Sequence, residues 1–99
     1  MKYFPIFLNA EKIDALVIGG GDVAARKIEL LLKTTTKITV VSASLSNTVN
    51  RLISQHKLTW LAHDYKTGLM ANKTLVIAAT DDEDVNAEVS REASSLDLL

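Results

Sequence analysis

The sequence predicts an α/β domain in which helices cover both faces of a mostly parallel sheet, and three observations predict it. Short segments rich in Val, Ile, Leu and Ala recur at residues 13–18, 38–41, 58–62 and 74–80. Segments with apolar residues at helical spacing lie between most of them. The first apolar segment also breaks into three glycines before a helical pattern begins. Strands that alternate with helices in this way form parallel sheets with right-handed crossovers.

The first half of the chain contains two central strands and the helix between them. Residues 13–18 are apolar throughout, which is typical of a parallel strand covered on both faces. Residues 3–8 are expected to be extended at a sheet edge, because Pro5 cannot donate a ladder hydrogen bond. The helix after the glycines has its apolar stripe at Ala24, Ile28, Leu31 and Leu32. The β-branched residues at 38–41 favour the second strand.

The second half repeats the pattern. A serine among residues 42–44 is expected to cap the next helix, whose apolar stripe is Leu45, Val49, Leu52 and Ile53. The third strand is predicted at 58–62 and the fourth at 74–80, joined by a polar connection with a short helical turn at 69–71. The acidic residues 81–84 then open a last helix, where carboxylates complement the helix dipole, with its stripe at Val85, Val89, Ala93 and Leu96.

The glycines directly behind the first strand indicate a dinucleotide site. Gly19 permits a tight turn, and Gly21 lets a pyrophosphate approach the backbone. Ala24 lets the helix pack closely on the strand. Backbone N–H groups at the helix start attract phosphate, so the candidate phosphate contacts are Gly19, Gly20, Gly21, Asp22 and Val23. The Asp22 carboxylate would repel phosphate, so its backbone N–H is the useful group. The alternative is a helix–sheet junction whose glycines serve only packing.

Two further strand ends are expected to line the same site. Ser42, Ala43 and Ser44 follow the second strand, where many dinucleotide folds carry a ribose-binding acid. No Arg or Lys follows until Arg51, so a 2′-phosphate would have no charged partner and NAD is favoured over NADP. Thr80, after the fourth strand, is a candidate to hydrogen-bond a phosphate or ribose.

Composition narrows the classes of protein. The chain of 99 residues is expected to be one domain, residues 1–99, with a net charge of −1 that gives no basis for nucleic-acid binding. It has no apolar run long enough for a membrane span and no cysteine, which fits a cytoplasmic setting. His56 and His63 lack partners at metal-ligand spacing and are expected to be solvent-exposed, so no metal site is predicted. Another strand normally follows the last helix, so we expect the chain to be a truncated piece of a longer protein.

Three separated motifs resemble one family. They are Phe4-Pro5-Ile6-Phe7-Leu8, the segment from Val17 to Lys27 around the glycines, and Ala78-Ala79-Thr80-Asp81-Asp82 with Val85 and Asn86. In this order they resemble the NAD-binding N-terminal domain of siroheme synthase, a Rossmann-type three-layer αβα domain. The resemblance implies NAD-dependent oxidation of precorrin-2, a tetrapyrrole, to sirohydrochlorin, followed in many members by ferrous iron insertion. It also implies a homodimer when full-length.

The resemblance also says what to expect of individual positions. Gly21, Asp22 and Val23 would contact the dinucleotide phosphates, with Ala43 and Ser44 near the adenosine. The family's candidate catalytic aspartate would lie beyond Leu99, so no catalytic residue is assigned here and the chain alone is expected to be inactive. Many members carry Gly-Ala where this chain has Thr34-Thr35-Thr36, which indicates a different helix cap or some strain.

Two other readings stay open. One is a regulatory domain that senses dinucleotides without catalysis, although such domains usually carry the acid that Ser42 replaces. The other is a methyltransferase that binds S-adenosylmethionine, which also prefers an acid there and fits three consecutive glycines less well. Titration with NAD, NADP and S-adenosylmethionine discriminates among the three readings.

Overall fold

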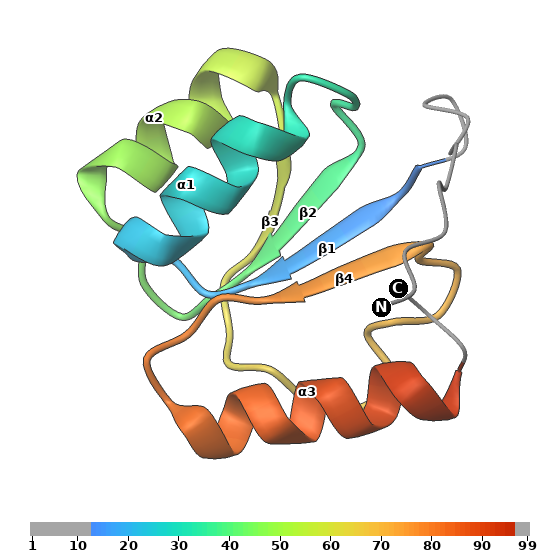
Figure 1. Ribbon diagram of the computed structural model, residues 1–99. Helices are drawn as coiled ribbons and strands as arrows, with labels where there is room; N and C mark the ends of the chain where they lie inside the picture. The colour runs from blue at the N-terminus through green and yellow to red at the C-terminus, as the bar shows by residue number, and fades with distance from the viewer. Residues whose placement is uncertain (1–12, 97–99) are drawn as a thin grey trace, which may run out of the picture.

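A parallel sheet of four strands in the order β3-β2-β1-β4 forms the centre of the protein (Figure 1). The structure, a computed structural model, describes residues 13–96. The elements are β1 (Ala15–Ile18), α1 (Asp22–Leu31), β2 (Ile38–Val41), α2 (Asn47–His56), β3 (Thr59–Leu61), β4 (Leu75–Ala78) and α3 (Glu83–Ser95). Helices α1 and α2 cover one face and α3 covers the other (Figure 1). The predicted three-layer α/β architecture is therefore confirmed.

The central strands lie where the apolar segments predict them. β1 pairs in parallel with β2 and with β4, so that Ile18 lies beside Val41 and Ala78 at the carboxyl ends. All four residues of β1 and of β2 are buried, because both faces of these strands are covered by helices. The predicted strand at 3–8 lies outside the described residues.

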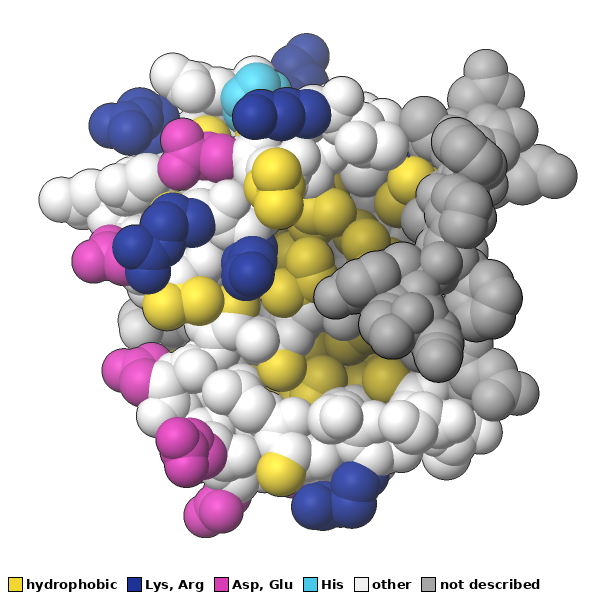
Figure 2. Space-filling model, viewed as in Figure 1, with side chains coloured by type: hydrophobic (Ala, Val, Ile, Leu, Met, Phe, Trp, Pro, Cys, Tyr) yellow, Lys and Arg dark blue, Asp and Glu magenta, His cyan; other side chains and the backbone are white. Residues whose placement is uncertain are grey.

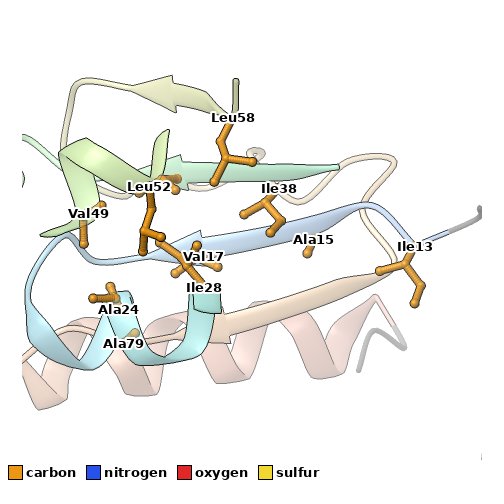
Figure 3. Close-up of a cluster of buried hydrophobic side chains, with 12 residues drawn as sticks. Ile13, Ala15, Val17, Ala24, Ile28, Ile38, Val49, Leu52, Leu58 and Ala79 are labelled. Carbon is orange, nitrogen blue, oxygen red and sulfur yellow. The ribbon is translucent and has the colours of Figure 1, made fainter. Parts of the chain in front are cut away.

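The face under α1 and α2 holds the larger core cluster. Val17 on the sheet packs with Ile28 of α1 and Leu52 of α2, and these side chains converge in Figure 3. Ala24 and Ile28 have no exposed surface. The small Ala24 side chain lets α1 pack closely on the sheet, as its place after the glycines predicts. The stripe of α2 is likewise confirmed, since Leu45 and Ile53 pack against the same cluster.

The face under α3 holds a second cluster. Leu16 and Ile18 of β1 pack with Met70, Val89 and Ala93. Within the predicted stripe of α3 the expectation for Leu96 is wrong, because α3 ends at Ser95 and Leu96 is 50% exposed. The connection between β3 and β4 forms turns at 67–72 and no helix, so the helical turn expected at 69–71 is absent. Met70 nevertheless anchors this connection in the core.

The helix caps explain where the elements begin. Ser46 caps α2 by accepting a hydrogen bond from the Val49 N–H at 3.2 Å. The expectation of a capping serine within 42–44 is therefore wrong, because the chain needs those residues for the turn after β2. Asp82 caps α3, accepting from the N–H groups of Asp84 and Val85, which confirms the interpretation of the acidic run. None of the helices within residues 13–96 is both long and apolar enough to cross a membrane.

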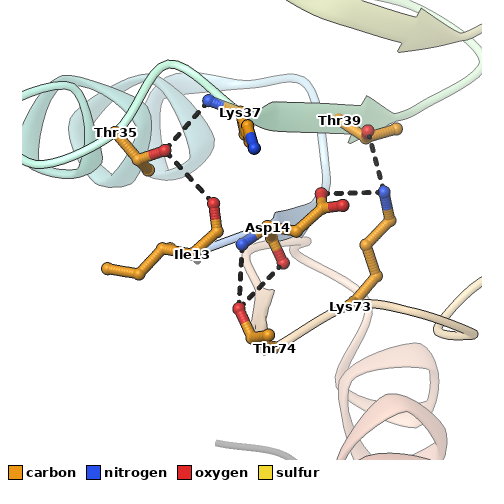
Figure 4. Close-up of polar contacts among 7 residues, drawn as sticks. All are labelled: Ile13, Asp14, Thr35, Lys37, Thr39, Lys73 and Thr74. Atoms are coloured by element: carbon orange, nitrogen blue, oxygen red, sulfur yellow. Dashed lines mark hydrogen bonds and ion pairs between the residues drawn. The ribbon is translucent and has the colours of Figure 1, made fainter. Parts of the chain in front are cut away.

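A polar network closes the other end of the sheet, where the strands begin (Figure 4). The Thr35 hydroxyl accepts from the Lys37 N–H at 3.0 Å and donates to the Ile13 carbonyl at 3.3 Å. Lys73 Nζ donates to Asp14 Oδ1 at 3.0 Å and to the Thr39 hydroxyl at 3.3 Å. None of the residues 34–36 has a positive φ. The threonines after α1 thus end the helix in a way that differs from the Gly-Ala of many siroheme synthases, and they do so without backbone strain.

This network gives a stability prediction. Thr35→Val keeps the side-chain shape but removes the hydroxyl, and Thr35 is only 7% exposed. We expect the free energy of unfolding to fall by about 1–2 kcal/mol, because the side chain loses one buried and one part-buried hydrogen bond. Urea denaturation measures the change.

The matched control is Thr36→Val. Thr36 is exposed, and within residues 13–96 its side chain makes no hydrogen bond. This variant should shift the free energy of unfolding by less than about 0.5 kcal/mol. Equal losses in the two variants would show that the network is not the source of stability.

Candidate functional site

A cavity of about 600 Å³ opens at the carboxyl ends of the strands, between the starts of α1 and α3. Ligands of open parallel sheets bind at this edge, outside the strand ends where the strand order reverses. Here β1 is flanked by β2 on one side and β4 on the other. The cavity is lined by Ile18, Gly19, Gly20, Gly21, Val41, Ser42, Ser44, Leu45, Ser46, Asp64, Tyr65, Thr80, Asp81, Asp82 and Val85.

The first two glycines are required by their neighbours within the protein. Gly19 has a φ of +134°, and a Cβ there would lie 2.3 Å from the Ala79 carbonyl oxygen. A Cβ on Gly20 would lie 2.3 Å from the Ser44 carbonyl oxygen. Gly20 also accepts a hydrogen bond from the Ser46 N–H at 2.7 Å. These two glycines therefore bring the turn after β1 against the turns after β4 and β2.

Gly21 differs, because a Cβ there would meet no atom within 4 Å. It is the N-cap of α1 with an extended backbone, φ −101° and ψ −157°, a conformation open to every residue type. Packing within residues 13–96 therefore does not require a glycine at this position. Gly21 lines the cavity, and a side chain at this position would enter open space.

The start of α1 presents unused donors beside this space. No side chain caps α1, whereas Ser46 and Asp82 cap α2 and α3. Within residues 13–96 the backbone N–H groups of Asp22, Val23 and Ala24 have no acceptor, and Ala25 donates the first helical bond, to Gly21. Such N–H groups, together with the helix dipole, bind anions. The geometry suits a phosphate group.

The end of β2 forms a second wall of the cavity. The Ser42 hydroxyl donates to the Ser44 carbonyl at 2.6 Å, so its proton is used within the turn. Trp60 Nε1 of β3 donates to the Ser42 carbonyl at 2.9 Å, which fixes the turn from the neighbouring strand. The Ser44 hydroxyl, exposed at the cavity, makes no hydrogen bond within residues 13–96. It can serve a ligand as donor or acceptor.

The charge of the cavity wall is acidic. Asp64, Asp81 and Asp82 line it, and no Lys or Arg of the described residues does. Figure 2 shows the same asymmetry, with acidic side chains gathered where α3 begins and most basic side chains over α1 and α2. The acidic wall repels negative charge, and the N–H groups at the start of α1 attract it. The site therefore favours a ligand that carries its negative charge only on the part next to the start of α1.

The structure brings most of the predicted site residues together. Six of them line the cavity, namely Gly19, Gly20, Gly21, Ser42, Ser44 and Thr80. The side chains of Asp22, Val23 and Ala43 are exposed outside its wall, so Asp22 and Val23 would act through their backbone N–H groups. Of the two histidines, His56 is exposed as expected, whereas His63 is half-buried and its ring contacts the Asp64 carbonyl. No cluster of metal-ligating side chains occurs in the described part of the chain.

Asp64 and Tyr65 are among the wall residues that the sequence reasoning missed. They lie in the irregular connection after β3 and reach the cavity because β3 pairs with β2. Tyr65 is held there by its hydroxyl, which donates to Glu92 of α3, and Glu92 also accepts from the Gly68 N–H at 3.1 Å. The signal available in the sequence was position: in a parallel sheet the residue after each strand lies at the ligand edge.

Comparison with known proteins agrees with this geometry. The model of a family described as "Putative NAD(P)-binding" matches residues 6–99. The chain is 41% identical over 99 residues to a siroheme synthase of Pseudoalteromonas atlantica, and 42% identical over 99 residues to siroheme synthase 1 of Serratia proteamaculans. In both cases all of this chain aligns with 21% of the relative. The chain thus spans about a fifth of the length of these curated relatives.

A solved structure is also similar. It is that of SirC, precorrin-2 dehydrogenase, with a TM-score of 0.76 and 27% sequence identity. The match covers 89% of this chain and 44% of that one. The Rossmann-like arrangement of helices and strands is therefore shared with a protein of that name.

Proposed function

Since the chain belongs to the NAD(P)-binding family whose model covers residues 6–99, we propose that its cavity binds NAD. We further propose that it is the NAD-binding part of a precorrin-2 dehydrogenase of siroheme synthesis. The observation that carries the proposal is the uncapped start of α1 beside Gly21, where a Cβ would enter open space. The similarity to siroheme synthases and to SirC, precorrin-2 dehydrogenase supports the reaction.

The residues present fit a dinucleotide. The N–H groups of Asp22, Val23 and Ala24 would hold the pyrophosphate, because they lack acceptors within the described residues. The Ser44 hydroxyl and the turn around Ala43 would meet the adenosine at the end of β2. Thr80 would border the other half of the ligand at the end of β4. Its hydroxyl proton and its backbone N–H already have protein acceptors, so Thr80 would serve through an oxygen lone pair.

Bound NAD supplies the acceptor for the hydride that leaves precorrin-2 when it is oxidised to sirohydrochlorin. This chain's own part is to bind the dinucleotide and fix its orientation at the sheet edge. Among residues 13–96, no Lys or Arg that could pair with the carboxylates of a tetrapyrrole lines the walls, so we propose that other parts of the protein bind the substrate. We therefore expect the chain by itself to bind NAD without turning over precorrin-2.

Calorimetric titration of the chain with NAD, NADP and S-adenosylmethionine tests the proposal. NAD should bind most tightly. Tighter binding of S-adenosylmethionine would replace the proposal with the methyltransferase reading. Addition of precorrin-2 to the NAD-loaded chain should then produce no NADH absorbance. The same assay on a full-length siroheme synthase with this domain in place should produce it.

Preference between the two dinucleotides gives a separate prediction. NADP carries an additional phosphate on the adenosine ribose, near a wall to which the described part of the chain contributes Asp64 but no Lys or Arg. We expect NADP to bind at least about tenfold more weakly than NAD, a difference of about 1.4 kcal/mol, because like charges repel. Added salt should narrow the difference by screening.

The control for this prediction is a pair of Asp→Asn variants. Asp64→Asn should narrow the difference in affinity between NAD and NADP. Asp22→Asn removes a negative charge from a side chain that lies outside the cavity wall. This variant should narrow the difference in affinity between NAD and NADP less than Asp64→Asn does. If NADP binds as well as NAD at low salt, the acidic wall does not select the cofactor.

Three properties of the longer protein are proposed on the resemblance to siroheme synthase. They are the subsequent insertion of ferrous iron, assembly as a homodimer, and location in the cytoplasm. Iron insertion is tested by adding ferrous iron and sirohydrochlorin to the full-length protein and following the absorbance of the product. Light scattering tests the dimer, and fractionation of cells tests the location.

A further inference from the structure

One side chain of α3, Asn86, holds the backbone of Thr80 where the chain leaves β4. The Asn86 Oδ1 atom accepts from the Thr80 N–H at 3.3 Å, and Asn86 Nδ2 donates to the Thr80 carbonyl at 3.0 Å. The amide thus satisfies both backbone groups of one residue, as a neighbouring strand does in a ladder. It continues the pairing of β4 for one residue past its end.

Asn86 also engages the Thr80 hydroxyl. This hydroxyl donates to Asn86 Oδ1 at 2.7 Å or to the Asp82 carbonyl at 3.0 Å, and it accepts from the Asp82 N–H at 3.1 Å. One proton therefore has two protein acceptors. The threonine side chain stabilises the turn into α3, and Asn86 joins that turn to the helix.

The backbone held in this way forms the cavity wall opposite Ser42 and Ser44. Thr80 lines the cavity. The position that a Cβ on Gly19 would take is 2.3 Å from the Ala79 carbonyl oxygen and 3.2 Å from the Thr80 backbone nitrogen. A shift of residues 79 and 80 would therefore change the opening beside the glycine turn. In a sheet of this kind the adenosine lies at the end of β2, so the β4 side receives the rest of a dinucleotide.

We propose that Asn86 is a positioning residue for the half of NAD beyond the adenosine. The inference rests on the proposed function, since it assumes that the cavity binds NAD. Asn86 acts through Thr80 and need not touch the ligand. Its loss should weaken the binding of NAD more than the binding of AMP, which has only the adenosine half and one phosphate.

The experiment compares Asn86→Ala with Asn50→Ala by calorimetric titration with NAD and with AMP. Asn50 is an exposed asparagine in the middle of α2, so its variant controls for removal of an amide from a helix. We expect Asn86→Ala to bind NAD about tenfold more weakly, which corresponds to a loss of about 1.4 kcal/mol in the free energy of binding. Its affinity for AMP should be unchanged. Asn50→Ala should bind both ligands as the unmodified chain does. Asn86→Asp keeps both acceptor contacts and loses one donor, so its NAD affinity should be intermediate.

The outcomes separate the two proposals. If the unmodified chain does not bind NAD, the proposed function fails before Asn86 is tested. If it binds and folded Asn86→Ala binds NAD equally well, the inference about Asn86 is wrong. A parallel loss for NAD and AMP would also overturn it, because that pattern indicates general loosening of the fold. Should Asn86→Ala not fold, as judged by circular dichroism, Asn86→Asp decides: unchanged NAD binding would overturn the proposal, and a selective loss would support it.

Discussion

Gly21→Val is expected to abolish measurable NAD binding while the protein stays folded. The Gly21 backbone is extended, which a β-branched residue adopts readily, and a Cβ there contacts no protein atom within 4 Å. The valine side chain would instead fill the space that we assign to the pyrophosphate. We expect a loss of roughly 100-fold or more, equivalent to about 2.8 kcal/mol, by calorimetric titration. The thermal unfolding midpoint should fall only slightly, because valine is a poorer N-cap residue than glycine.

The control is Ala71→Val. Ala71 is exposed in the turn between β3 and β4 and lies outside the cavity wall. A comparable increase in side-chain size there should leave the affinity for NAD nearly unchanged. If Gly21→Val keeps its affinity, the pyrophosphate does not lie at the start of α1.

Gly19→Ala is expected to lower the stability of the protein, whereas Gly21→Val acts mainly on NAD binding. Gly19 has a φ of +134°, which L-residues rarely adopt, and the new Cβ would lie 2.3 Å from the Ala79 carbonyl oxygen. The obstacle is backbone just past the end of β4, which cannot move aside without disturbing the hydrogen bond from the Ala79 N–H to the Ile18 carbonyl, 2.8 Å long. We expect a loss of about 3 kcal/mol or more in the free energy of unfolding. That is a large share of the 5–15 kcal/mol or so typical of a domain.

Gly21→Ala provides the matched comparison, because the same atom group is added two residues away. It should lower the free energy of unfolding by no more than about 1 kcal/mol, the cost of a poorer N-cap residue, since the added Cβ meets no atom within 4 Å. Equal unfolding midpoints for Gly19→Ala and Gly21→Ala would contradict the distinction between structural and ligand-facing glycines.

The strands and helices could be predicted because their burial follows local periodicity. Residues 15–18 and 38–41 are continuous apolar runs, and they are buried on both faces. The glycine turn was predictable for the same reason, since Gly19, Gly20 and Gly21 follow a buried strand directly. Leu96 fitted the stripe of α3, but its exposure depends on where the helix ends, which the stripe does not encode.

The side-chain contacts that the sequence could not reveal are those that depend on how the chain folds back on itself. Tyr65 reaches the cavity because Glu92, 27 positions later, binds its hydroxyl. Asn86 meets Thr80 only because the turn after β4 reverses the chain into α3. The sequence did not identify the serine that caps α2, because residues 42–46 contain three serines. Which of them is the cap depends on the hydrogen bond from the Ser46 N–H to Gly20, in the turn after β1.

Trp60 gives the protein an intrinsic fluorescence signal close to the cavity. It is the single tryptophan of the sequence, it is 41% exposed, and its indole N–H is bonded to the Ser42 carbonyl. Indole emission responds to the polarity around the ring and to its hydrogen bonds. The protein therefore carries an intrinsic fluorophore bonded to the side of the cavity to which we assign the adenosine, and its signal can be followed without an attached label.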